Sequence, residues 1–154
     1  MIGVFPHVVE RRSNMLFRGF DDTFMVPHSR HTTVLREDIE RAGCLKILAS
    51  SPEAGGYAMS TENGRQIFIT GHSEYDPRTL EKEYLRDKNA GLPIAVPKNY
   101  YPNDDDTQPP KVTWRSCANL LYSNWLNYFV YQTTPFDLGE LPGTKDRGGE
   151  ETTT

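Results

Sequence analysis

The alternation of hydrophobic and polar positions predicts a chain that mixes strands and helices. Apolar, β-branched runs predict strands at residues 2–9 and 45–49. Two further runs, residues 57–60 and 66–69, flank Asn63-Gly64, a dipeptide that favours the tight turn of a β-hairpin. We therefore expect four strands, the last two of which form a hairpin.

Three segments have helical patterns. Residues 35–42 predict a short helix that ends at Gly43, because glycine suits the left-handed conformation at a helix C-terminus. Asp76 and Pro77 predict a second helix, with Asp76 as its N-cap and Pro77 as its first residue. Residues 114–132 predict the longest helix. Apolar residues at steps of four and three place one face of this helix in the core: Trp114, Ala118, Leu121, Trp125 and Tyr128.

The remaining segments are expected to connect these elements. Residues 11–30 have no sustained period, and residues 92–111 are rich in Pro, Asn and Asp, so both predict loops. Residues 139–154 are polar and Gly-rich, which predicts a disordered tail after a single domain at residues 1–138.

Composition narrows the class of protein. The chain has 154 residues, of which 36% are apolar and 25% charged, as in an ordinary soluble domain. A net charge of -4 argues against nucleic acid or an anionic membrane as a partner. The sequence contains no apolar run near the ~20 residues that span a bilayer. Only two cysteines occur, so we expect a reducing, cytoplasmic compartment.

The most informative segment ends the fourth predicted strand. The run Ile67-Phe68-Ile69 is followed by Thr70-Gly71, and then by His72 and Glu74. Open α/β sheets bind ligands at the carboxyl ends of their strands, so these polar side chains are well placed for function. A carboxylate beside an imidazole fixes its tautomer and stabilises its cation. We predict that His72 is a general base and that Glu74 orients it.

The nucleophile for such a base is not evident. Cys44 follows the C-terminal end of a short predicted helix, which is electrostatically unfavourable for a thiolate. Cys117 lies in the first turns of the longest helix next to Arg115, but its spacing places it beside the apolar face. A small buried side chain is the better interpretation of Cys117.

Other clusters of potential ligands do not form convincing sites. His28 and His31 have no carboxylate or cysteine at the usual spacing, so no metal site is predicted there. Residues 103–106, Asn-Asp-Asp-Asp, lack the glycine and the distal glutamate of a calcium loop. They predict a solvated acidic loop.

Several sequence blocks, in order, resemble the C-terminal half of the homoserine O-acyltransferases, which succinylate or acetylate homoserine in methionine biosynthesis. The blocks include Arg-Gly-Phe-Asp-Asp at 18–22, Pro-His-Ser-Arg at 27–30, Thr-Gly-His-Ser-Glu-Tyr-Asp at 70–76, Asn-Tyr-Tyr-Pro at 99–102, Trp-Arg-Ser at 114–116 and the aromatic-rich run 123–135. The resemblance implies the C-terminal part of a class I glutamine amidotransferase-like fold, a flavodoxin-like, three-layer α/β architecture.

The resemblance also implies a chemistry. In that family a cysteine takes the acyl group from acyl-CoA and passes it to the homoserine hydroxyl. His72 would accept the proton, Glu74 would be its partner, Ser29 would contact substrate, and Arg86 would bind the homoserine carboxylate. A guanidinium suits that last role because it pairs with a carboxylate through two hydrogen bonds. No cofactor or metal is implied, acyl-CoA is a substrate, and a homodimer would be unsurprising.

Two family features are expected to lie ahead of Met1: the nucleophile, in a Cys-Trp-Gly type sequence, and a substrate-binding lysine. Ser73 stands where proline is common and Cys117 where histidine is common, and neither position is expected to carry chemistry. We therefore expect a fragment that is inactive alone. Two alternatives stay open: a fragment of a glutamine amidotransferase-like hydrolase, and a non-catalytic chain that assembles with a separate N-terminal half.

Overall fold

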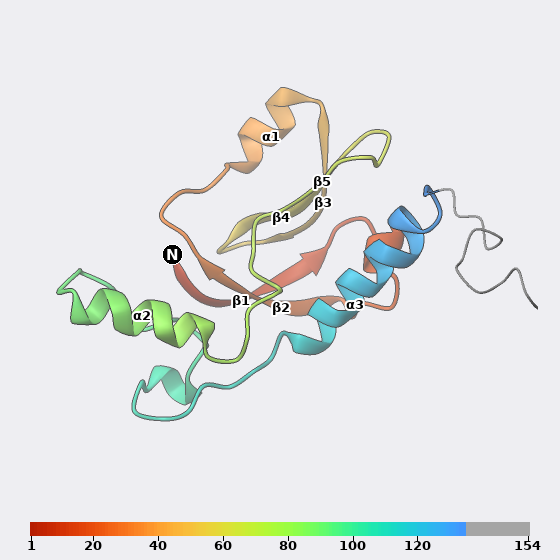
Figure 1. The fold of residues 1–154 in the computed structure, drawn as a ribbon. Coiled ribbons are helices and arrows are strands. Elements are labelled where there is room, and N and C mark those ends of the chain that lie inside the picture. The colour runs from red at the N-terminus through yellow and green to blue at the C-terminus, as the bar shows by residue number, and fades with distance from the viewer. Residues whose placement is uncertain (135–154) are drawn as a thin grey trace, which may run out of the picture.

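A five-stranded antiparallel sheet forms the centre of the molecule. The computed structural model describes residues 1–134, and its sheet has the strand order β2-β1-β3-β4-β5 (Figure 1). The strands are β1 (Ile2–Val9), β2 (Thr23–Ser29), β3 (Leu45–Ser51), β4 (Gly55–Thr61) and β5 (Ile67–Ile69). The α/β class is confirmed, and the four predicted strands are present. The expected tail, residues 139–154, lies outside the described residues.

The order and direction of the strands differ from those of an open parallel sheet. The ladders between named strands in the described part are all antiparallel. One parallel bridge joins Gly3 to Lys98 of the long loop. The bridge requires glycine at position 3, because a Cβ there would lie 2.6 Å from the Lys98 carbonyl oxygen. The ordered loop at 92–111 is thus held against β1 by backbone contacts.

Strand β2 was not predicted, and its sequence explains why. It contains Pro27, which lacks an N–H and interrupts the expected alternation. In the fold β2 is an edge strand, where a proline is tolerated because one side of the strand needs no ladder partner. The carbonyl oxygen of Pro27 is used instead by His72, whose backbone N–H donates to it at 2.8 Å.

The helices confirm the predicted positions with corrections at their ends. They are α1 (Arg36–Ala42), α2 (Thr79–Asn89) and α3 (Arg115–Trp125), and a π-helix (Leu126–Val130) continues α3. Gly43 has the left-handed conformation expected at the end of α1. The predicted N-cap at Asp76 is wrong. Helix α2 begins at Thr79, and Asp76 contributes only its carbonyl oxygen to a preceding turn.

The predicted buried face of α3 is correct in its first half only. Trp114 and Leu121 are buried, whereas Trp125 is 42% exposed. Asn124 is buried in its place, because its amide donates to the carbonyl oxygens of Leu16 and Arg18 at 3.0 and 2.8 Å. The spacing of apolar residues places Trp114, Leu121 and Trp125 on one face of the helix. It does not show which of them the other described residues cover.

Two apolar clusters hold the sheet to helices α2 and α3, and a smaller one, Ile39 with Ile47 and Met59, holds it to α1. The first joins β2, β3 and β4 to α3 and consists of Leu16, Phe17, Phe24, Val26, Leu48, Ala49, Tyr57, Ala58 and Leu121. The second joins β1 to α2 and to the start of α3 and consists of Val4, Leu80, Tyr84, Tyr100, Tyr101, Trp114 and Ala118. In the view of Figure 1 the segment between β5 and α2 passes over β1 and β2, and the His72 N–H in this segment donates to the Pro27 carbonyl oxygen of β2.

Candidate active site

His72 and Glu74 form a hydrogen-bonded pair immediately after β5. The imidazole Nδ1 lies 2.8 Å from Oε1 of Glu74. Since a carboxylate only accepts, Nδ1 carries the proton and Nε2 is free to act as a base. The His72 side chain is 35% exposed and that of Glu74 is 55% exposed, so substrate could reach the pair. The geometry is that of a base with an orienting carboxylate.

Backbone contacts on two sides fix the turn that carries this pair. The N–H of Thr70 donates to the Tyr57 carbonyl oxygen of β4 at 2.9 Å, and the N–H of His72 donates to that of Pro27 in β2. Gly71 packs so closely on β2 that a Cβ there would lie 2.5 Å from Val26 Cγ1. The turn therefore connects the two edges of the sheet, strand β5 at one edge and strand β2 at the other, and holds His72 between them.

Tyr75 stacks on the imidazole of His72, a contact that the sequence analysis does not predict. The two ring centroids are 4.3 Å apart with an interplanar angle of 16°. The Tyr75 hydroxyl donates to Oε1 of Glu83 at 2.7 Å. Burial raises the pKa of Tyr75, and the carboxylates of Glu83 and Glu74 act in the same direction. Tyr75 thus remains a neutral hydrogen-bond donor and a flat wall against His72.

Arg86 lies on the same side of α2 as this wall. Arg86 follows Glu83, which accepts the Tyr75 hydroxyl hydrogen bond, by three residues, so both side chains lie on one face of the helix. The charge of its guanidinium opposes the rise in the pKa of Tyr75. The Arg86 Nε donates to Asp87 Oδ1 at 2.7 Å, and the arginine side chain is 69% exposed. No hydrogen bond joins Arg86 to His72 within residues 1–134. The guanidinium lies on the Tyr75 side of α2 and is accessible from solvent.

Ser29 ends β2, two residues after Pro27, whose carbonyl oxygen binds the His72 backbone. It is half-buried and pairs with Ile2 of β1. Its hydroxyl has no hydrogen-bond partner among the described residues. The turn that holds His72 and the end of β2 that holds Ser29 are therefore neighbours through the backbone.

Beneath this turn lies a pair of fully buried histidines that the sequence analysis did not identify. His7 and His28 are both 0% exposed, and their Nε2 atoms are 3.1 Å apart. The Nδ1–H of His7 donates to the Phe5 carbonyl oxygen at 2.9 Å, so His28 donates to His7 through Nε2. The Nδ1 of His28 then has no partner in the described part.

This pair is held in the neutral state. Burial lowers the pKa of His7 to about 4 and that of His28 to about 3, and the charge of Arg30 acts in the same direction. The neighbouring histidines lower the pKa of His28 further. Phe24, Val26 and His28 lie on the same face of β2, because they are two residues apart along the strand. That spacing is the only sequence signal for the burial of His28.

Neither cysteine is placed as a nucleophile for His72. Burial raises the pKa of the Cys117 thiol, which opposes thiolate formation. Cys44 is exposed beyond α1. The Ser73 hydroxyl is buried against the Tyr57 hydroxyl at 2.7 Å. In residues 1–134, no thiol or hydroxyl is hydrogen-bonded to the free Nε2 of His72.

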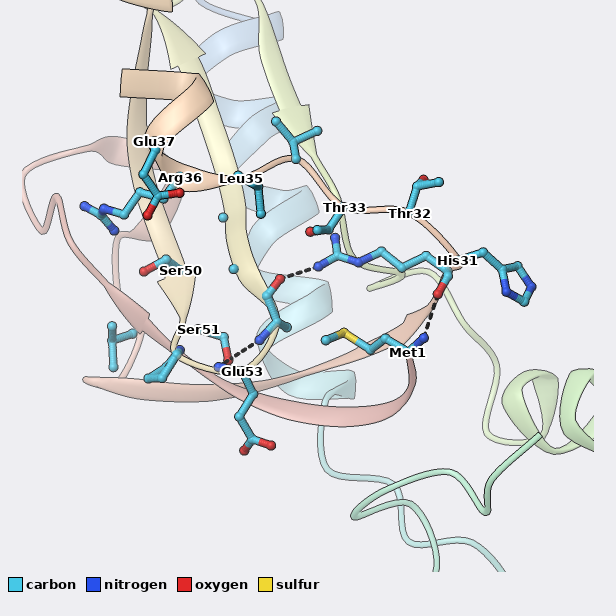
Figure 2. A pocket seen from close by; sticks show the side chains of 17 residues that line it. Met1, His31, Thr32, Thr33, Leu35, Arg36, Glu37, Ser50, Ser51 and Glu53 are labelled. Carbon is cyan, nitrogen blue, oxygen red and sulfur yellow. Dashed lines mark hydrogen bonds between the residues drawn. The ribbon is translucent and has the colours of Figure 1, made fainter. Parts of the chain in front are cut away.

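A pocket of about 650 Å³ opens beyond Ser29, at the C-terminal end of β2. Figure 2 shows it between the segment that follows Ser29 and the turn that joins β3 to β4, with Thr33 and Leu35 on one side and Ser51 and Glu53 on the other. His72 and Glu74 do not line it. Its polar lining includes His31, and the Ser51 hydroxyl accepts hydrogen bonds from the backbone N–H groups of Glu53 and Ala54.

The described residues contain no group of three potential metal ligands. His28 is buried and His31 exposed, so the two do not form a site. In the acidic loop, Asp105 bonds Thr107 and Gln108 of its own turn. Among these residues there is likewise no helix with the length and apolarity that crossing a membrane requires.

Comparison with known proteins identifies the family. The family model for homoserine O-succinyltransferase matches residues 1–136. The chain belongs to this family. Homoserine O-acetyltransferase of Acetivibrio thermocellus is 62% identical over 141 residues, which are 92% of this chain and 46% of that protein.

Other relatives match the same region. Homoserine O-acetyltransferase of Brevibacillus brevis is 62% identical over 138 residues, 90% of this chain and 45% of that protein. The protein of the same name from Desulfitobacterium hafniense strain DCB-2 is 60% identical over 141 residues, 92% of this chain and 46% of that protein. The chain thus spans slightly less than half the length of these curated relatives.

Proposed function

We propose that this chain supplies the proton-accepting half of a homoserine O-acyltransferase of methionine biosynthesis, in the cytoplasm. The observation that carries the proposal is the 2.8 Å contact between His72 and Glu74 in a chain of this family. The names of the relatives favour acetyl-CoA over succinyl-CoA as the donor. Both are substrates, and the reaction needs no cofactor or metal.

In this proposal the chemistry has two steps. A cysteine thiol outside the described residues loses its proton to His72 Nε2 and attacks the acyl-CoA thioester, which forms an acyl-enzyme and expels the CoA thiolate. His72 returns its proton to that thiolate, so CoA leaves as the thiol and the imidazole is again free to act as a base. The homoserine hydroxyl then attacks the acyl carbon, with His72 again taking the proton, and the thiol is regenerated. Glu74 stabilises the imidazolium in both steps.

Substrate contacts are assigned to two residues near the pair. Arg86, whose guanidinium is accessible beside Tyr75, would bind the homoserine carboxylate through paired hydrogen bonds. Ser29, whose hydroxyl makes no bond within residues 1–134, would contact substrate at the end of β2. We also propose that residues 1–134 form the C-terminal part of a class I glutamine amidotransferase-like fold. Strands from a polypeptide equivalent to the unmatched part of the relatives would complete its sheet. Nothing in the site favours glutamine hydrolysis, so that alternative is set aside.

The test uses a chimera in which the unmatched N-terminal part of the Acetivibrio thermocellus relative is joined to this chain. Release of CoA from acetyl-CoA and from succinyl-CoA is measured with and without homoserine. We expect homoserine-dependent release that falls about 10²–10⁴-fold in His72→Asn and in Glu74→Gln. Arg86→Gln should raise KM for homoserine more than it lowers kcat.

The matched control is His31→Asn, an exposed histidine outside the proposed site, which should keep full activity. An active chimera whose rate is unchanged by His72→Asn would overturn the assignment of the base. Glutamine hydrolysis without acyl transfer would overturn the proposed reaction. The chain alone should be inactive, and acyl transfer by it at the chimera's rate would contradict the need for an outside nucleophile.

A further inference from the structure

Arg30 is a half-buried cation in the wall of the pocket that opens beyond Ser29. Its Nη2 donates to the carbonyl oxygen of Ala54, in the turn between β3 and β4. Its Nε is buried and has no hydrogen-bond partner within residues 1–134. Burial lowers the pKa of Arg30, because the folded chain solvates the charge less well than water does. The guanidinium is therefore held in the pocket wall with part of its bonding capacity unused.

Arg30 also lacks a counter-ion, unlike two other charged side chains of the same pocket. Arg36 forms an ion pair with Glu10 at 2.7 Å, and Glu53 forms one with Lys98. In the described part of the chain, Arg30 forms no ion pair with a carboxylate. A partly buried charge is costly without a partner, so the pocket suits an anion that comes from outside this part of the chain.

Hydroxyl groups line the pocket together with this charge. The Ser51 hydroxyl oxygen accepts hydrogen bonds from two backbone N–H groups, at 3.3 and 3.1 Å, so its proton is left to donate to a ligand. Thr33 lies across the pocket from Ser51 (Figure 2). In the same view the imidazole of His31 points away from these groups, so no ligand contact is assigned to it. A guanidinium with hydroxyl donors is a set that suits the oxygen atoms of a phosphate group.

The pocket adjoins the segment that carries the candidate base. Gly56 lines the pocket, and its carbonyl oxygen accepts a hydrogen bond from the Thr70 hydroxyl at 2.7 Å. Thr70 precedes His72 by two residues, and Arg30 directly follows Ser29. The pocket and the His72–Glu74 pair are therefore neighbours through the contact between Gly56 and Thr70.

We propose that Arg30 binds a phosphate group of acyl-CoA in this pocket. The inference rests on the proposed function, in which acyl-CoA is the donor and Arg86 on α2 binds the homoserine carboxylate. The phosphates are the anionic groups that acetyl-CoA and succinyl-CoA share. A volume of about 650 Å³ also suits part of a large ligand, since pockets of this size enclose molecules much bigger than an amino acid.

The first experiment follows the Arg30 side chain by NMR while CoA is added to this chain. Its Nε–H is buried, which slows exchange with water and makes its resonance observable. We expect a saturable change in this resonance with CoA. Pantetheine, which lacks phosphate, and homoserine, which has only a carboxylate, should cause no change. No change with CoA, or an equal change with pantetheine, would overturn the proposal.

The second experiment measures acyl transfer in the chimera described above. Arg30→Gln should lower kcat/KM for acetyl-CoA and for succinyl-CoA about 10–100-fold, because a hydrogen-bonded charge pair is lost. The kcat/KM for homoserine should stay within about twofold, because in a two-step reaction through an acyl-enzyme it reports the second step alone. Arg30→Lys keeps the charge without the planar donors and should lie between wild type and Arg30→Gln.

The matched control is Arg41→Gln, which removes the same charge outside the pocket. Arg41 is exposed near the end of α1 and pairs with Asp38 at 2.9 Å, so its loss should leave both kcat/KM values unchanged. Circular dichroism and thermal unfolding check that each variant folds. An equal effect of Arg41→Gln and Arg30→Gln would show a general effect of charge and overturn the site. So would a fall for homoserine alone, or for succinyl-CoA alone, since another carboxylate would then be the ligand.

Two further outcomes separate this inference from the proposed function. A CoA-dependent change at Arg30, with a chimera that transfers no acyl group, would support the site and contradict the function. Acyl transfer to homoserine by the Arg30→Gln chimera with the wild-type kcat/KM for acetyl-CoA would support the function and overturn the site.

Discussion

At the scale of single residues, Tyr75 connects the His72–Glu74 pair to helix α2. Its ring stacks on His72 at 4.3 Å between centroids, and its hydroxyl bonds Glu83 of α2 at 2.7 Å. The carbonyl oxygen of Tyr75 accepts a hydrogen bond from the Trp114 indole at 3.0 Å. The imidazole is thus oriented by Glu74 at one nitrogen and by Tyr75 across its face.

This stacking predicts a spectroscopic difference between two variants. Tyr75→Phe keeps the ring and should leave the His72 Cε1–H proton resonance ring-current-shifted, whereas Tyr75→Leu should move it toward the random-coil value. Both variants lose the bond to Glu83, so they share that cost of about 1 kcal/mol in the free energy of unfolding. NMR of the chain measures the shift. An identical His72 resonance in the two variants would contradict the stacking.

At the scale of elements, the turn after β5 is positioned by its contact with strand β2. Gly71 is the closest point, since its Cβ position is 2.5 Å from Val26 Cγ1 and 3.0 Å from His28 Nε2. The next residue, His72, donates its N–H to the Pro27 carbonyl oxygen at 2.8 Å. An edge strand that the sequence did not predict therefore sets the position of the candidate base.

The close approach predicts that Gly71→Ala displaces the turn. Its methyl group would meet the packed Val26 side chain, so we expect a loss of about 1–3 kcal/mol in the free energy of unfolding. The His72 resonance should also shift. Denaturant unfolding and NMR provide the two measurements.

Gly43→Ala is the matched control for this substitution. Gly43 has open space around its Cβ position and a φ of +65°. Its replacement by alanine should therefore lower the free energy of unfolding by about 1–2 kcal/mol through backbone strain alone. The His72 resonance should not change in this variant. A Gly71→Ala protein with wild-type stability and an unchanged His72 resonance would show that the turn is not held by this contact.

At the scale of the whole molecule, the neutral His7–His28 pair couples stability to pH. The pKa of each falls from an ordinary 6.5 to about 4 for His7 and about 3 for His28. Below pH 6.5 the unfolded chain binds protons at these positions and the folded chain does not. The free energy of unfolding is therefore highest above pH 6.5 and decreases as the pH falls toward the folded pKa values.

Each histidine should contribute a slope of up to about 1.4 kcal/mol per pH unit in this window. Between pH 6.5 and 5 we expect a total loss of about 3 kcal/mol in urea unfolding experiments. The carboxyl groups with lowered pKa values, such as Glu10 and Asp106, titrate below this window. His28→Gln should roughly halve the slope, and the exposed control His31→Gln should leave it unchanged.

A direct measurement complements the unfolding experiments. The ring proton resonances of His7 and His28 should not titrate between pH 7 and 5 in the folded chain. Titration of either ring near pH 6.5 would contradict the buried, neutral pair, and a flat stability profile across the window would do the same.

The sequence by itself determined the features that depend on neighbours in the chain. The positions of β1, the β4–β5 hairpin and the end of α1 at Gly43 follow from local period and turn chemistry. The pairing of His72 with Glu74 also follows, because only Ser73 separates them in one turn. The family was recognisable from short blocks in a fixed order.

Only the tertiary structure decided the features that join distant segments. Strand β2 forms despite Pro27 because it lies at a sheet edge, and the Asp76 cap fails because the chain turns once more before α2. The stacking of Tyr75, the His7–His28 pair and the exposure of Trp125 depend on which surfaces meet in space. Local propensity carries no information about such contacts, since their free energy comes from residues far apart in the sequence.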